Sequence, residues 1–212
     1  AYEEFNFYKV YHALNNFFTV DLSAIYLDVL KDRLYTGKKD GTPRRASQTV
    51  VYELLSHLTR IMAPILSFLA EEVHEYIPGS SNTSIFTTSF PKVNTEWQNN
   101  ELKQDFSTLL DVRTEVSQAL EPLRQDKTIG SSLDAKIKIQ ATGQRFQTLK
   151  KYEAELLELF IVSQMTLIES DENVITADRA DGEKCVRCWH YSTELNSEAE
   201  HPEICPKCLD AF

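Results

Sequence analysis

The four cysteines of this chain form two Cys-x2-Cys pairs near its end, Cys185 with Cys188 and Cys205 with Cys208. Each pair can present two thiolates from one tight turn, and two such pairs supply the four soft ligands that tetrahedral zinc prefers. Four thiolates leave no open coordination position on the metal. The spacing therefore predicts one zinc ion with a structural role, not a catalytic one.

Other uses of these thiols remain open. Two disulfides would use all four cysteines, although the rest of the chain has none to extend a disulfide framework. A redox Cys-x-x-Cys is disfavoured because neither pair follows a strand in a βαβ pattern. Iron can also occupy four thiolates. Reduced thiols without a secretion signal indicate a cytoplasmic protein.

Charged and aromatic residues surround the cysteines. Trp189 immediately follows Cys188, in a module too small to bury a large ring easily. The ring could cover the metal turn, or it could stack on an unpaired RNA base. Arg187, His190 and Lys207 could contact phosphates or base edges. They could instead offset the formal charge of −2 that zinc and four thiolates carry together.

A second group of basic residues lies in a chain whose formal net charge is −10. The group comprises Lys31, Arg33, Lys38, Lys39, Arg44 and Arg45. These side chains could be solvated loop charges, or they could form a phosphate-facing patch on an otherwise acidic protein. The acidic total itself argues against indiscriminate nucleic-acid binding.

The elements that must hold these residues indicate a mainly α fold in three parts. Apolar side chains at helical spacing predict a helical bundle over residues 1–90, and turn formers in residues 78–100 mark its boundary. Residues 91–180 add a strand period of two at Ala135–Gln140 and predict a small α+β module. Residues 181–212 predict a four-cysteine zinc ribbon or knuckle, which is too short to hold a core without its metal.

Three finer predictions concern where the helices begin, end and bend. Asp21 is expected to cap one helix of the bundle, and Thr42 to cap the next, a long helix with Pro43 in its first turn. Pro64 removes one backbone donor and is expected to kink that long helix. Residues 145–160 are expected to form one helix between two strands.

Several functions find no support in the sequence. No glycine-rich phosphate loop, His-Glu-x-x-His motif or Gly-x-Ser-x-Gly turn occurs, and no catalytic constellation is visible. No run of about 18 apolar residues occurs, so we expect no membrane span. The chain opens at Ala1, without an initiator methionine and directly in a helical pattern, which suggests a piece of a longer protein.

Several segments together resemble one family. They are Phe5–Tyr11, Asp21–Asp28, Lys31–Tyr35, Met62–Glu72 and Gly130–Ala135, together with the Cys-x-x-Cys-Trp turn. Over nearly the whole chain they resemble the C-terminal region of class I isoleucyl-tRNA synthetases of the bacterial type. The helical segments alone would also suit the valyl and leucyl synthetases, but the zinc turn with Trp189, together with Asp21-Leu-Ser and Lys31-Asp-Arg-Leu-Tyr, favours isoleucine.

The resemblance implies a function in RNA recognition without catalysis. The bundle would be the anticodon-binding domain, and the zinc module would help to hold the anticodon region of isoleucine tRNA. The partners would be that tRNA and the remainder of the synthetase chain, in a cytoplasmic monomer. The ATP-binding and adenylate-forming signatures of the family are absent, so this chain should not charge tRNA alone. The basic residues of 31–45 would contact phosphates, and Arg187, Trp189 and Lys207 would act near the anticodon loop.

Two other classes of protein compete with this hypothesis. One is a protein-interaction module, in which a helical bundle with a zinc ribbon docks a partner protein; the acidic total mildly favours it. The other is a free-standing zinc enzyme, which coordination by four cysteines disfavours because it leaves the metal no open position.

Overall fold

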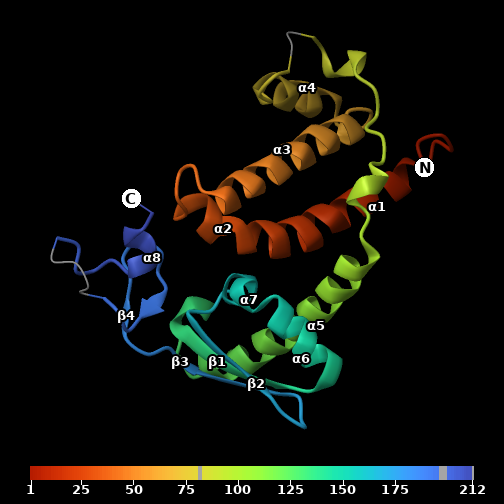
Figure 1. The fold of residues 1–212 in the computed structure, drawn as a ribbon. Helices are drawn as coiled ribbons and strands as arrows, with labels where there is room; N and C mark the ends of the chain where they lie inside the picture. The colour runs from red at the N-terminus through yellow and green to blue at the C-terminus, as the bar shows by residue number, and fades with distance from the viewer. Residues whose placement is uncertain (81–82, 196–199, 212) are drawn as a thin grey trace. The chain divides into compact units, whose positions relative to one another are not determined.

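The computed structural model describes residues 1–80, 83–195 and 200–211. The chain folds into two compact units, one made of Ala1–Leu34 and Lys39–Gln98, the other of Tyr35–Lys38 and residues 99–212. The first unit is helical and the second holds the sheets (Figure 1), and all four cysteines belong to the second unit. The predicted fold class is confirmed. The division near residues 90 and 180 stays a prediction, and Ser81 and Asn82 of the predicted boundary lie outside the described residues.

The first unit begins with one uninterrupted helical run. It consists of α1 (Phe7–Asn16), a π-helical segment (Phe17–Leu27) and α2 (Asp28–Tyr35). Asp21 lies inside this run, so the prediction that it caps a helix was wrong. A residue caps a helix only where the backbone before it is not helical, and no glycine or proline breaks the run ahead of Asp21. Val10 and Leu30 of this run are buried.

The long helix α3 (Thr42–Met62) has Gly41 as its N-cap residue, with φ −66° and ψ 136°. Thr42 is already helical and makes no capping bond, so the prediction that it caps the helix was wrong. Pro43 occupies the first turn, as predicted. Its missing N–H is one of the groups that a helix start leaves without an intrahelical partner.

Pro64 separates two helices where we predicted a kink in one. Helix α3 ends at Met62, and α4 (Ser67–Tyr76) begins after a turn in which Leu66 has φ −111° and ψ 55°. Proline has no N–H to donate and its ring crowds the preceding turn. Here the chain leaves the helix altogether. The 3-10 turns η2 (Ile85–Thr87) and η3 (Thr95–Trp97) complete the unit.

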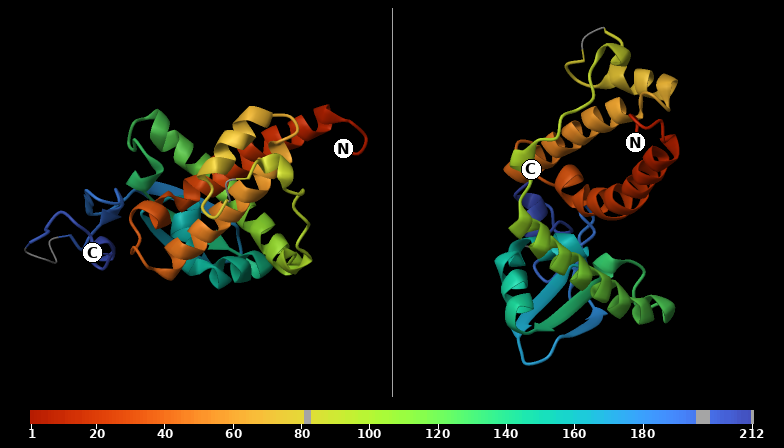
Figure 2. Two further views of the ribbon diagram at one scale, coloured as in Figure 1. Left: turned by 90° about the horizontal axis from the view of Figure 1, so that it is seen from above. Right: turned by 90° about the vertical axis from the view of Figure 1, so that its right-hand side faces the viewer.

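The second unit has a three-stranded sheet at its centre, in the order β2-β1-β3. Helix α5 and the 3-10 turn η4 precede the first strand, and helices α6 and α7 connect β1 to its parallel neighbour β2, while β3 runs antiparallel to β1. Figures 1 and 2 show α5, α6 and α7 gathered beside this sheet. The bounds are α5 (Asn100–Gln125), η4 (Ser132–Asp134), β1 (Ala135–Ala141), α6 (Gly143–Lys151), α7 (Glu153–Phe160), β2 (Gln164–Glu169) and β3 (Val174–Arg179).

The core of this unit lies between α5 and one face of the sheet. Strand β1 buries every second residue, as its period of two predicts, and α5 buries residues at helical spacing. The buried side chains are Leu109, Val112, Val116, Leu120, Ala135, Ile137, Ile139 and Ala141. Lys136 and Lys138 are less buried and alternate with these residues along β1. Only one face of the strand is therefore closed by helices.

The expected single helix over residues 145–160 is divided in two at Tyr152, where φ is −110° and ψ is 20°. The Tyr152 hydroxyl donates to the Asp105 carboxylate of α5 at 2.9 Å, and its ring lies against Phe106. These contacts between distant segments fix the position of the break, and no helix-breaking residue marks it in the sequence. No described helix is long and apolar enough to cross a membrane.

A bidentate ion pair joins α5 to α6 and makes stability depend on pH. The Arg145 Nη1 and Nη2 groups donate to the Glu115 carboxylate, at 2.8 and 2.7 Å. These bonds lower the pKa of Glu115, against the raising effect of burial. The unfolded chain therefore binds this proton more tightly, so the pair stabilises the fold above about pH 4.5 and loses its effect as the pH falls further.

We expect Glu115→Gln to remove part of the acid sensitivity of the second unit. Because the pair is partly exposed, the difference should stay below about 1 kcal/mol. Urea unfolding at pH 7 and at pH 3 measures it, with the exposed Glu155→Gln on α7 as the matched control. An equal change in both variants would contradict the assignment.

Candidate metal centre and RNA-facing surface

The four cysteines lie together at the end of the second unit. All four are buried and unoxidised, and their sulfur atoms lie within 4.8 Å of one another. The Cys188 and Cys205 sulfurs are 3.7 Å apart. A tetrahedral zinc ion with Zn–S bonds of about 2.3 Å separates its sulfurs by about 3.8 Å, whereas a disulfide needs about 2.05 Å. The donor set fits zinc, and the disulfide alternative does not describe this structure.

Backbone hydrogen bonds shape the two cysteine turns. In the first, the Cys185 N–H donates to the His190 carbonyl and the Trp189 N–H to the Cys185 carbonyl, both at 2.9 Å. The short strands β4 (Glu183–Lys184) and β5 (Tyr191–Ser192) pair on either side of this turn. The second turn opens the short helix α8 (Pro206–Leu209). Local bonds thus place each pair of thiols.

The protonation of the thiols depends on their surroundings. Burial raises the pKa of Cys188 and raises that of Cys208 to about 11. Burial acts on Cys185 as well, but N–H groups of Cys188, Cys205 and Arg187 outweigh it and lower the pKa of Cys185 to about 6. A bound divalent ion would favour four thiolates in this small apolar site, since it supplies the opposing charge that the buried sulfurs lack.

Trp189 is held outward from the metal site. It has φ +66°, in the left-handed region, and 62% of its surface is exposed. The interpretation in which its ring covers the metal turn therefore loses support. The exposed ring offers a flat apolar face beside the cysteine cluster.

The other predicted residues of this end differ in their surroundings. Arg187 donates from Nη1 to the Cys208 carbonyl at 3.2 Å and so links the two turns. That bond suits the interpretation in which a cation offsets the charge of the thiolates. His190 Nδ1 lies 3.3 Å from the Cys188 carbonyl. Lys207 is exposed on α8.

The six basic residues of 31–45 lie on three consecutive elements: Lys31 and Arg33 on α2, Lys38 and Lys39 in the following loop, and Arg44 and Arg45 in the first turn of α3. Several of them form ion pairs with nearby carboxylates. Lys31 pairs with Asp28 at 2.7 Å, Lys38 with Asp210 at 2.8 Å, and Arg45 with Asp40 at 2.6 Å. The Arg44 Nε is buried and donates to no acceptor among the described residues.

Some residues that shape this end were missed in the sequence. Ser163, Gln164 and Asp134 bind the chain that leads into the cysteine turns. Ser131 and Asp134 form a reciprocal capping box, and the Ser-x-x-Asp spacing of that box was the one available signal. Ser163 and Gln164, at the start of a strand, carry no comparable signal in the sequence.

Two family models match separate parts of the chain. A family model described as the anticodon-binding domain of tRNA ligase matches residues 1–139. A second, described as a zinc finger found in FPG and IleRS, matches residues 182–211. Since the first match covers more than half of the chain, the chain belongs to the anticodon-binding domain family of the tRNA ligases.

The resemblance to isoleucyl-tRNA synthetases is confirmed by individual relatives. The chain is 45% identical over 225 residues to the isoleucine–tRNA ligase of Natranaerobius thermophilus, which covers 98% of this chain. It is 43% identical over 222 residues to that of Geobacter sulfurreducens and 41% identical over 220 residues to that of Syntrophotalea carbinolica, covering 100% and 99%. The chain spans about a quarter of the length of these relatives, 24% of each.

Proposed function

We propose that this chain is the tRNA-recognition part of an isoleucine–tRNA ligase. Such a ligase attaches isoleucine to its tRNA with ATP; this part would bind the anticodon region and perform no chemistry itself. The matches to an anticodon-binding domain and to a zinc finger of isoleucyl synthetases support the assignment. One zinc ion, held by Cys185, Cys188, Cys205 and Cys208, would keep the C-terminal end folded.

The observation that carries the proposal is the outward Trp189. At a left-handed position glycine fits without strain, whereas other residues cost about 1–2 kcal/mol. An exposed aromatic ring there adds little to folding. It can contribute about 1–3 kcal/mol by stacking on an unpaired base of an RNA loop. We therefore assign Trp189 to base stacking, and propose that Arg187 and Lys207, from the two cysteine turns, contact the same RNA loop.

Phosphate contacts would come from the basic residues of 31–45. Helix α3 begins without a side-chain cap, so its first N–H groups and positive dipole end favour an anion. Arg44 and Arg45 lie in that turn, and Arg44 has a buried Nε without a partner in the described chain. Phosphate contacts of this kind orient an RNA without reading its sequence.

The remainder of the synthetase chain is the second proposed partner. The first unit exposes large apolar side chains, among them Phe68 at 94% and Tyr76 at 80% on α4, and Phe5 at 79%. Exposed apolar groups in such number are typical of surfaces that another protein covers. Within that larger enzyme we propose a monomer, and the unoxidised thiols support a place in the cytoplasm.

We expect Trp189→Ala to weaken tRNA binding by about 5- to 150-fold with zinc retained, from about 1–3 kcal/mol per stacked base. Filter binding with isoleucine tRNA measures the affinity, and elemental analysis the zinc. Trp97→Ala is the matched control, since Trp97 is 64% exposed and lies in the other unit. Equal affinities for both variants and the unchanged protein would refute the role of Trp189.

The same assay tests the phosphate contacts and the main rival function. Arg44→Ala with Arg45→Ala should reduce the dependence of binding on salt, whereas the exposed pair Lys92→Ala with Lys103→Ala should not. A minihelix lacking the anticodon stem should bind weakly. A protein-interaction module would bind neither RNA, and that result would favour the rival.

A further inference from the structure

Residues 180–184 form the junction between strand β3 and the zinc module. Side chains of the sheet bind both the backbone and the side chain of Asp181 in this junction. The Gln164 side chain donates from Nε2 to the Asp181 carbonyl at 2.9 Å and accepts from the Asp181 N–H at 2.8 Å. The Lys136 ammonium contacts both carboxylate oxygens of Asp181, at 2.8 and 3.0 Å. A polar Asp-Gly segment, which the sequence would suggest to be flexible, is thus fixed to β1 and β2.

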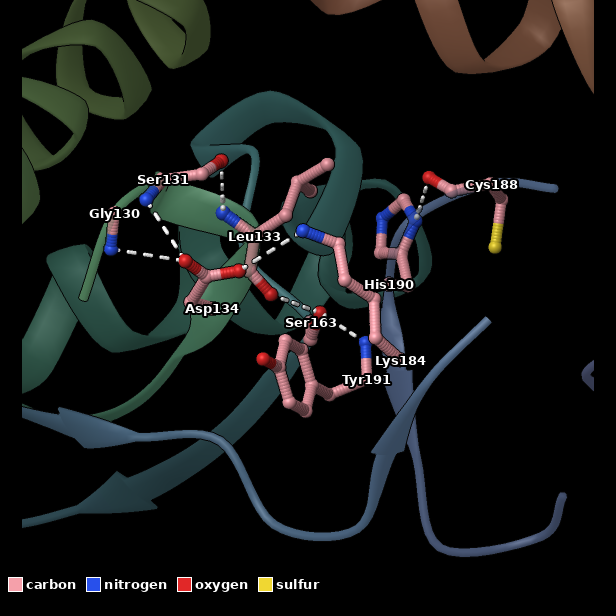
Figure 3. A network of polar contacts seen from close by, with 9 residues as sticks. All are labelled: Gly130, Ser131, Leu133, Asp134, Ser163, Lys184, Cys188, His190 and Tyr191. Carbon is pink, nitrogen blue, oxygen red and sulfur yellow. Dashed lines mark hydrogen bonds and ion pairs between the residues drawn. The ribbon is translucent and has the colours of Figure 1, made fainter. Parts of the chain in front are cut away.

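Ser163 makes a second connection, shown in Figure 3. Its hydroxyl donates to the Leu133 carbonyl and accepts from the Tyr191 N–H of β5 at 2.7 Å. One oxygen therefore bonds the entry to β1 and the hairpin that carries Trp189. A hydroxyl can fill both roles because it has one donor and two acceptor positions.

Asp134 makes the third connection. One carboxylate oxygen accepts from the Gly130 and Ser131 N–H groups, each at 2.9 Å, which closes the loop before β1. The other lies 3.4 Å from the Lys184 ammonium of β4, and the Asp134 side chain is only 14% exposed (Figure 3). The Asp134 carbonyl also accepts from the Ala180 N–H at 2.8 Å. The segment 130–135, notable in the sequence, thus binds both ends of the junction.

Glycine lets the junction close. Gly182 has φ +84°, and a Cβ at this position would lie 2.2 Å from the Ser192 carbonyl oxygen. The backbone of the junction and that of β5 are therefore in direct contact, with no room for a side chain. Three polar connections and this close approach leave the hairpin one orientation on the sheet.

We propose that Ser163, Gln164 and Asp134 are positioning residues that hold the zinc module and the sheet module as one rigid body, so that Trp189 meets RNA in a fixed orientation. The part of this inference that concerns RNA rests on the proposed function, whereas the rigidity of the two modules does not depend on it. A module that is already ordered loses less conformational freedom on binding, which raises affinity without adding a contact. The zinc ion would stabilise the fold of the zinc module, and the junction would fix the orientation of that module relative to the sheet.

The test compares two Ser-Gln pairs in the zinc-loaded protein. Ser163→Ala with Gln164→Ala removes two connections, and Ser117→Ala with Gln118→Ala makes the same changes at exposed positions of α5. Rotational correlation times from ¹⁵N relaxation of residues 183–195 and of strand β1 report the rigidity. Zinc content and affinity for isoleucine tRNA are measured on the same samples.

We expect the unchanged protein and the α5 variant to tumble with one correlation time throughout the second unit. The junction variant should keep its zinc, show a shorter correlation time for residues 183–195, and bind tRNA about tenfold more weakly. Independent tumbling in the unchanged protein, or unchanged tumbling in the junction variant, would overturn the proposal. No tRNA binding by any sample, with the tumbling result as expected, would overturn the proposed function alone.

If Ser163→Ala with Gln164→Ala unfolds the protein, a second variant tests the same proposal. Lys136→Met with Lys184→Met removes two partly exposed ion pairs, to Asp181 and Asp134, and leaves the hydroxyl and amide bonds in place. A smaller decrease in the rotational correlation time of residues 183–195 would support the proposal. Unchanged tumbling of residues 183–195 would count against a positioning role for Asp134.

Discussion

Removing zinc should unfold the end of the chain that carries Trp189 and leave the first unit folded. The small core there consists of the four cysteines and Ile204, with Leu195 and Leu209 packed against them. So few apolar groups cannot offset the ordering of the segment, and metal binding at such sites supplies about 10–16 kcal/mol of folding free energy. The loss of tRNA affinity should be at least as large as for Trp189→Ala.

A chelator titration followed by NMR checks this expectation, with the N–H signals of Cys185 and Tyr191 as reporters of the module. Cys188→Ser should weaken zinc binding by more than about 100-fold. Val186→Ser, an exposed change in the same turn, is its control and should bind zinc normally. If the module kept its signals after the metal was removed, zinc would not be its organising element.

Gly182→Ala should destabilise the β4–β5 hairpin by about 3 kcal/mol or more. The left-handed φ of +84° costs an alanine about 1–2 kcal/mol. Its Cβ would also approach the Ser192 carbonyl carbon to 2.6 Å and the Thr193 nitrogen to 2.8 Å, so the paired strand must shift. These neighbours are backbone atoms, which cannot rotate away.

Gly143→Ala is the control for Gly182→Ala. Gly143 has φ +54° and no atom within 4 Å of a Cβ, so its substitution should cost only the backbone strain. Hydrogen exchange of the Cys185 N–H, which donates across the turn to His190, measures local opening of the hairpin. If both substitutions changed the exchange rate of that N–H equally, the backbone would have shifted to remove the contact between the new Cβ and Ser192, and the prediction would be wrong.

The zinc site could be predicted from the chain because its geometry is local. Two residues between paired cysteines already place two sulfurs on one turn, and only the meeting of the two turns requires a fold. The alternation of Ala135, Ile137 and Ile139 likewise predicted which side of β1 is buried, and the structure confirms it. In both cases the pattern lies in residues close together in the sequence, so it does not depend on how the rest of the chain is arranged.

Helix ends were less predictable, because capping depends on what the preceding residues do. Asp21 and Thr42 have side chains that suit a cap, yet the backbone before Asp21 stays helical and Gly41 takes the capping position ahead of Thr42. Pro64 was correctly taken as an interruption, but whether a proline kinks or ends a helix depends on the packing of the segments on both sides.

Periodicity and spacing thus determined the mainly α fold class and the cysteine cluster, and the resemblance of several sequence segments indicated the isoleucyl synthetases. The tertiary structure alone decided that Trp189 lies outward and that Ser163, Gln164 and Asp134 hold its module. Ser163 binds Tyr191, 28 positions away, and Gln164 binds Asp181, 17 positions away. Hydrogen bonds from a side chain to a distant backbone group require no particular residue at the second position, so they leave no pattern in the sequence.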